Sequence, residues 1–95
     1  MPGIGLRRAK NIVGGDCIGI DETDGQFYIK FKIPITPSES YRISQLREAC
    51  GEDSLQKKKG KGNDKKTYAV GKVPVSKDPR NDGSLELSKF YAKKD

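Results

Sequence analysis

Residues 17–35 alternate between apolar and polar side chains, which is the two-residue period of strands with one buried face. The alternation is interrupted at Asp24 and Gly25, a pair preferred in two-residue type I′ turns because both positions need a positive φ. The pattern therefore predicts a β-hairpin with strands over residues 17–22 and 26–35.

A regular register across this turn gives the hairpin two chemically different faces. The apolar face is expected to bury Ile18 opposite Phe31, Ile20 opposite Ile29, and also Phe27 and Ile33. The other face carries Cys17, Gly19 and Asp21 on one strand and Tyr28, Lys30 and Lys32 on the next. Such charge is ordinary on a solvated sheet. It is also what a nucleic-acid platform needs, with both lysines at phosphates and Tyr28 stacked on a base.

A helix is predicted over residues 37–50. The preceding sequence has the form of a capping box, with Thr36 as N-cap, Pro37 in the first helical position and Glu39 reaching back. Gly51 suits the end of the helix. The apolar stripe consists of Ile43, Leu46, Ala49 and Cys50, and the outer face of Arg42, Gln45, Arg47 and Glu48.

Residues 67–75 are predicted to form another strand, with Ala69, Gly71, Val73 and Val75 on one face and Tyr68, Val70 and Lys72 on the other. Pro74 lacks an N–H, which restricts this end to a sheet edge or to the end of the strand. Residues 76–83 are dense in turn formers. Residues 84–92 fit a strand starting at Ser84 or, alternatively, a short helix.

Positive charge is concentrated in one segment. The net charge of the 95 residues is +6, and residues 57–66 (KKKGKGNDKK) supply +5 of it, from six Lys and one Asp. Repulsion between these lysines, together with Gly60 and Gly62, predicts a flexible loop over residues 56–66. The candidate phosphate contacts in this loop are Lys57, Lys58, Lys59, Lys61, Lys65 and Lys66.

The N-terminal sequence PGIGLRRAKNI, residues 2–12, has an apolar-Gly-apolar-Gly turn followed by Ala four residues after the second Gly. It resembles the hairpin and second-helix start of the helix-hairpin-helix family at Pro2, Gly3, Ile4, Gly5, Ala9 and Ile12. The resemblance implies that backbone N–H groups hold a DNA phosphate without sequence specificity. Arg7, Arg8 and Lys10 would add positive charge. The alternative is a flexible or strand-like basic arm over residues 1–13.

These elements predict one small α+β domain over residues 1–95, built from antiparallel hairpins and one helix. If the N-terminal arm is a strand, the order β-β-β-α-β-β matches an OB-like, partly open barrel. Other small α+β folds share this order.

The sequence lacks the residues that several kinds of catalytic and metal site need. The chain has no His, and its two Cys have neither a His partner nor the spacing of a zinc site. We therefore expect two reduced cysteines, no catalytic residues, no metal, no cofactor and no enzyme activity. No apolar run is long enough to span a bilayer and the first residues lack a signal peptide's apolar core, so a cytoplasmic protein without a membrane partner is expected.

Nucleic acid is the expected partner, DNA or RNA, with single strands favoured. Binding would be largely independent of sequence, through the Lys-rich loop and the face of Tyr28, Lys30 and Lys32. The alternative is a protein-interaction or assembly subunit, or a small inhibitor, of a larger complex such as a ribonucleoprotein or virus particle, with a protein partner or a homodimer. The location of the charges discriminates between them, because lysines gathered on one face favour nucleic acid.

Overall fold

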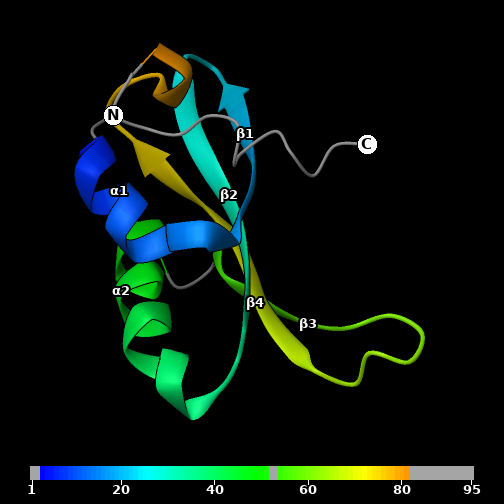
Figure 1. The fold of residues 1–95 in the computed structure, drawn as a ribbon. Coiled ribbons are helices and arrows are strands. Elements are labelled where there is room, and N and C mark those ends of the chain that lie inside the picture. Colours follow the sequence, from blue (N-terminus) through cyan, green and yellow to red (C-terminus); the bar gives the residue numbers. More distant parts are fainter. Residues whose placement is uncertain (1–2, 52–53, 82–95) are drawn as a thin grey trace.

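The computed structural model describes residues 3–51 and 54–81, which form a four-stranded antiparallel sheet with two helices on one of its faces (Figure 1). The order along the chain is α1 (Leu6–Val13), β1 (Cys17–Thr23), β2 (Gln26–Pro34), α2 (Ser40–Cys50), β3 (Gln56–Lys59) and β4 (Thr67–Val75), with short 3₁₀ turns at Gly14–Asp16, Pro37–Glu39 and Pro79–Asn81. The strands lie in the order β1-β2-β4-β3. Neither helix of the described part is long and apolar enough to cross a membrane.

The predicted α+β class, the first hairpin, the helix near 37–50 and the strand over 67–75 are all present. Asp24 and Gly25 both have positive φ, 53° and 78°, as the type I′ turn requires. The segment considered as a first strand is instead α1, so the described order is α-β-β-α-β-β in an open sheet. The strand or helix expected over residues 84–92 lies outside the described residues.

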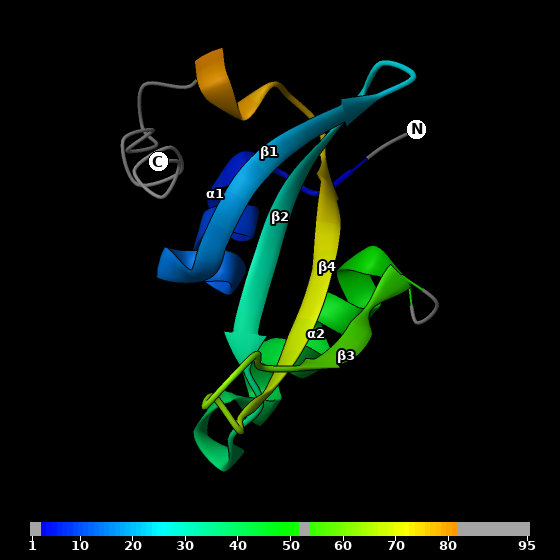
Figure 2. The same cartoon turned by 90° about the vertical axis from the view of Figure 1, so that its right-hand side faces the viewer.

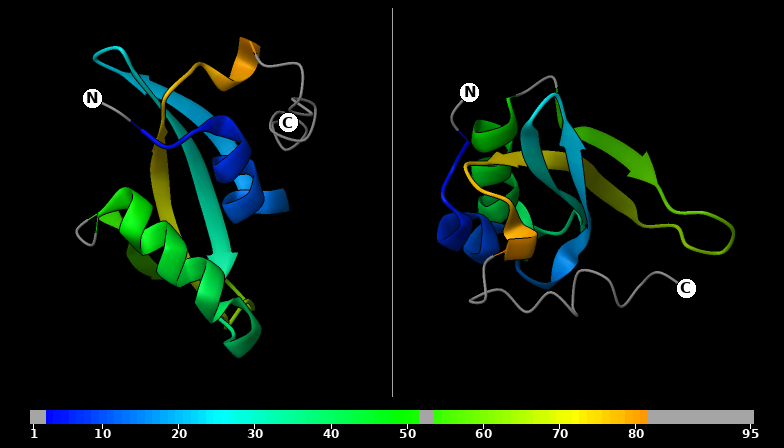
Figure 3. Two further views of the ribbon diagram at one scale, coloured as in Figure 1. Left: turned by 90° about the vertical axis from the view of Figure 1, so that its left-hand side faces the viewer. Right: turned by 90° about the horizontal axis from the view of Figure 1, so that it is seen from above.

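The core lies between the helices and one face of the sheet, as the view through the helices shows (Figure 3, left). The predicted alternation places Ile29, Phe31 and Ile33 of β2 there, each fully buried. β4 adds Ala69, Val73 and Val75, and the helices add Leu6, Ala9, Ile12, Val13, Ile43 and Leu46. Removing these apolar groups from water is the main stabilising contribution to the fold.

The predicted register fails at one position in β1. Ile20 lies opposite Ile29 as expected, but a β-bulge between Cys17 and Gly19 places Cys17, not Ile18, opposite Phe31. Cys17 is consequently 3% exposed and Ile18 39% exposed. A bulge adds one residue to one strand and exchanges the faces of the residues beyond it, which is why strict alternation gave the wrong side for both. Cys17 is buried and Cys50 partly buried, and no disulfide joins them.

The start of α2 also differs from the prediction. Residues Pro37–Glu39 form a 3₁₀ turn and the α-helix begins at Ser40. The Thr36 hydroxyl is bonded to the Ser38 hydroxyl at 3.1 Å instead of capping the helix, so the capping box is not formed. At the other end Gly51 has φ 86° and donates its N–H to the Arg47 carbonyl, which confirms it as the helix terminator.

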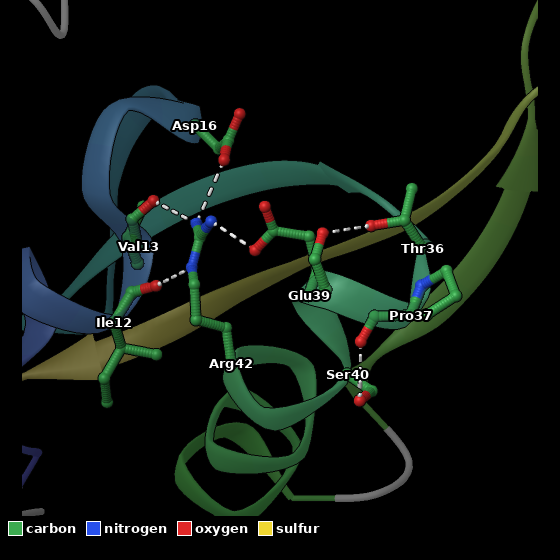
Figure 4. A network of polar contacts seen from close by, with 9 residues as sticks. Ile12, Val13, Asp16, Thr36, Pro37, Glu39, Ser40 and Arg42 are labelled. Carbon is green, nitrogen blue, oxygen red and sulfur yellow. Dashed lines mark hydrogen bonds and ion pairs between the residues drawn. The ribbon is translucent and has the colours of Figure 1, made fainter.

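Arg42, predicted to lie on the outer face of the helix, joins α2 to α1 (Figure 4). Its Nε donates to the Ile12 carbonyl at 2.9 Å, and its Nη2 donates to the Val13 carbonyl at 2.7 Å and to Asp16 at 3.0 Å. Its Nη1 donates to Glu39 at 2.7 Å. A guanidinium has five donors in a fixed plane, which suits the unpaired carbonyls at a helix C-terminus and two carboxylates at once.

Part of the predicted Lys-rich loop is ordered as a strand. Gln56–Lys59 forms β3 and pairs with Thr67–Val70 of β4, so the irregular connection is limited to residues 60–66. Lysines are poor strand formers, and here the strand is imposed by backbone pairing with β4. The hairpin of β3 and β4 projects away from the helices (Figures 1 and 3, right).

Substitution of Phe31 by Ala is expected to lower the free energy of unfolding by about 3–5 kcal/mol, because it leaves a cavity in the core. Ile18→Ala is expected to cost less than about 1 kcal/mol, because that side chain is already partly in water. Urea unfolding of both variants measures the difference. Equal losses would mean that β1 has no bulge and follows the regular register.

Candidate nucleic-acid interface

The face of the sheet opposite the helices is uncovered in the described part (Figure 2), and it carries Tyr28, Lys30 and Lys32 of the predicted site. β2 and β4 are antiparallel neighbours, with Tyr28 opposite Pro74, Lys30 opposite Lys72, Lys32 opposite Val70 and Pro34 opposite Tyr68. Because side chains alternate between the faces of a strand, all eight lie on the side away from the buried residues. We call this surface the open face.

The open face brings together four predicted residues, Tyr28, Lys30, Lys32 and Lys58, and two that the prediction of the site left out, Tyr68 and Lys72. Tyr28, Lys30 and Lys32 share it as expected. Tyr68 and Lys72 join them from β4, and Lys58 joins them from β3, opposite Tyr68. The alternation of residues 67–75 predicts that Tyr68 and Lys72 share one face of a strand, but it does not say which strand lies beside β2.

Two lysines lie over the two tyrosine rings. Lys72 Nζ is 4.4 Å from the centroid of Tyr28 and 2.8 Å from Asp21 Oδ2. Lys32 Nζ is 4.5 Å from the centroid of Tyr68. The hydrogen bond from Lys72 lowers the pKa of Asp21, so this carboxylate stays charged well below neutral pH. Each ring therefore has an ammonium group over one of its surfaces. An exposed cation–π pair contributes only about 0.5–1 kcal/mol, and Lys72 is held in addition by its ion pair with Asp21.

Asp64 anchors the far end of the hairpin to the open face. Its Oδ2 accepts the Tyr68 hydroxyl at 2.6 Å, and its Oδ1 accepts the backbone N–H of Lys66 at 3.0 Å. The Tyr68 bond lowers the pKa of Asp64 and raises the pKa of Tyr68, because it favours the charged carboxylate and the neutral phenol. Asp64, the one acidic residue of the basic segment, thus joins the Tyr68 side chain to the backbone of the connection between β3 and β4.

The six lysines of the predicted loop divide by position. Lys58 faces the same way as Tyr68, whereas Lys57 and Lys59 pair with Ala69 and Thr67 and point to the other side of the hairpin. Lys61, Lys65 and Lys66 lie in the connection. All six are exposed.

Arg7 and Arg8 do not belong to the open face. Both are exposed on α1, which covers the opposite side of the sheet (Figure 1). The turn of the helix-hairpin-helix resemblance is used within the fold: the Ile4 N–H donates to the Pro74 carbonyl at 3.1 Å, and the Ile4 carbonyl accepts the Ser76 N–H at 2.9 Å. The Ile4 N–H is therefore not available to a phosphate.

The open face is hollowed beside β4. A depression of about 570 Å³ is lined by Ile18 of β1, by Tyr28 and Lys30 of β2, by Val70, Gly71, Lys72 and Pro74 of β4, and by Cys50, Ser54 and Gln56. Burial raises the pKa of the Cys50 thiol to about 11, so it is neutral at physiological pH.

Comparison with models of protein families, with curated proteins and with solved structures finds no match. Within the described ranges, no group of three or more His, Cys, Asp or Glu side chains is placed to hold a metal ion.

Replacing Asp64 by Asn is expected to lower the pKa of Tyr68 toward that of an ordinary tyrosine, because the acceptor that stabilises the neutral phenol loses its charge. NMR titration of the tyrosine ring signals measures this, with Tyr28, which does not contact Asp64, as the internal control. An unchanged Tyr68 pKa would contradict the contact.

Proposed function

We propose that the protein binds single-stranded nucleic acid across its open face. The observation that supports this most is the alternation of two tyrosines with Lys30, Lys32 and Lys72 on adjacent strands of an uncovered sheet face. Aromatic rings stack on bases and ammonium groups neutralise phosphates, and the combination is typical of surfaces that bind single strands. The strand would cross β2 and β4, in the manner of an OB-fold.

Base stacking is energetically able to displace the lysines from the tyrosine rings. Stacking contributes about 1–3 kcal/mol per base, more than the exposed cation–π pair that it replaces. The released ammonium of Lys32 or Lys72 would remain beside the ring, where the phosphates of the stacked nucleotides lie. A double-stranded nucleic acid would gain no such stacking energy, because its bases already stack on one another. Single strands are therefore the preferred ligand.

The charges of the open face favour a polyanion. Lys30 makes no ion pair with the described residues, and Lys58 adds charge at the hairpin. Contacts with phosphates carry no sequence information, so the binding is largely independent of sequence, and it releases counterions, so it weakens with salt. DNA and RNA share this chemistry, and the cytoplasm is the proposed location.

The experiment is fluorescence anisotropy of labelled oligonucleotides across a salt series. Tyr68 lies opposite Pro34, six residues along β2 from Tyr28, which is a distance of about 20 Å. The oligonucleotides must be long enough to reach both rings. The double variant Lys30→Gln/Lys32→Gln is expected to weaken binding and to reduce the salt slope by about two, one for each lost phosphate contact. The matched variant Arg7→Gln/Arg8→Gln removes the same charge from the covered side and should change little.

Equal losses in the two double variants would mean that net charge, not the open face, attracts the ligand. No binding by the unaltered protein at low salt would contradict the proposal altogether. It would favour the alternative of a protein-interaction subunit, to be sought by pull-down.

Tyr28→Ala is expected to weaken single-strand binding by about 1–3 kcal/mol, because it removes one stacking surface. Tyr41→Ala is the control, since Tyr41 is 73% exposed on α2, away from the open face. The same anisotropy assay measures both. If the two variants bind equally well, stacking on Tyr28 plays no part.

A further inference from the structure

The hollow of the open face has the size and lining of a ligand site. Its volume of about 570 Å³ lies within the range of about 300–1,000 Å³ that is usual for small-molecule pockets. Val70 and Pro74 supply apolar surface and Tyr28 an aromatic ring, while Lys30 and Lys72 supply two ammonium groups, the second of which is paired with Asp21. This combination suits a flat, largely apolar group that carries a negative charge.

Two irregularities of the sheet create this hollow. The bulge in β1 turns Ile18 out of the core, so that a large apolar side chain forms part of the lining. The second irregularity is the late start of β3 at Gln56, opposite Val70. Between Val70 and Val75, where Ile4 forms a bridge, this edge of β4 has no paired strand among the described residues. Gly71 also lines the hollow, and its lack of a side chain allows close packing, because a Cβ there would come within 3.2 Å of the Ser54 carbonyl and 3.0 Å of the buried Phe31 ring.

Gln56 adds a polar group of a different kind. It is exposed and lines the hollow. An amide offers a donor and an acceptor together, and in this respect it matches the edge of a nucleobase, adenine above all. A bare phosphate would not use the apolar lining, and an apolar ligand would not use the two lysines.

We propose that the hollow holds one unstacked nucleotide of the bound strand, with its base against Ile18, Tyr28 and Val70. Its phosphate lies at Lys30 and Lys72, and the Gln56 amide bonds the edge of the base. The inference rests on the proposed function and deepens it. It predicts that an otherwise sequence-tolerant surface has a base preference at one position, for adenine.

The gap in the edge of β4 does not suit a peptide strand. Along this edge of β4, pairing with β3 stops at Val70 and the bridge to Ile4 is at Val75. Too few free backbone groups remain between these two points for an added strand. A mononucleotide fits the chemistry without requiring that edge.

The test is titration of the full chain with adenosine monophosphate, followed by backbone amide NMR shifts, together with anisotropy of dA, dC and dT oligonucleotides. We expect shifts centred on Gln56, Val70 and Lys72, and tighter binding of dA. Gln56→Ala should reduce the preference for dA about fivefold, the effect of one net hydrogen bond. The control Gln45→Ala removes an amide on α2, outside the hollow, and should leave the preference intact.

Oligonucleotide binding without shifts at the hollow would overturn this inference and leave the proposed function standing. The same holds if Gln56→Ala and Gln45→Ala behave alike. Loss of both mononucleotide and oligonucleotide binding would overturn the two together.

Discussion

The alternation along β2 is the constraint on which the rest of the structure depends. β2 lies between β1 and β4, and its odd-numbered residues Ile29, Phe31 and Ile33 are fully buried while Lys30 and Lys32 between them are exposed. A slip of one residue would place ammonium groups in the core and isoleucines in water, so the register is fixed by a large free-energy difference. The same alternation that builds the core therefore creates the charged surface.

Arg42 links the two helices that cover one face of the sheet. It bonds the last carbonyls of α1 and two carboxylates, and so joins the two helices that pack on the apolar face of the sheet (Figure 4). Asp64 has a corresponding role at the other end, where it ties Tyr68 to the Lys-rich connection. Fold and proposed function thus depend on a few polar contacts around a small apolar core.

The departures from regular structure coincide with the proposed ligand site. The bulge at Ile18 and the late start of β3 each cost packing or pairing that a regular sheet would have. Together they leave a hollow beside the lysines and Tyr28. Local violations of an otherwise consistent pattern are expected where a protein binds its ligand.

The sequence by itself determined the features that depend on near neighbours: the turn at Asp24 and Gly25, the buried face of β2, the apolar stripe of α2 and its end at Gly51. Only the tertiary structure decided the rest, because it depends on partners distant in sequence. Pairing with β4 turns Lys57–Lys59 from a predicted loop into a strand, and contact with α1 takes Arg42 from the predicted outer face. The bulge at Ile18, the separation of Arg7 from the open face and the meeting of Tyr68 with Lys32 follow from packing and strand order, which no local pattern encodes.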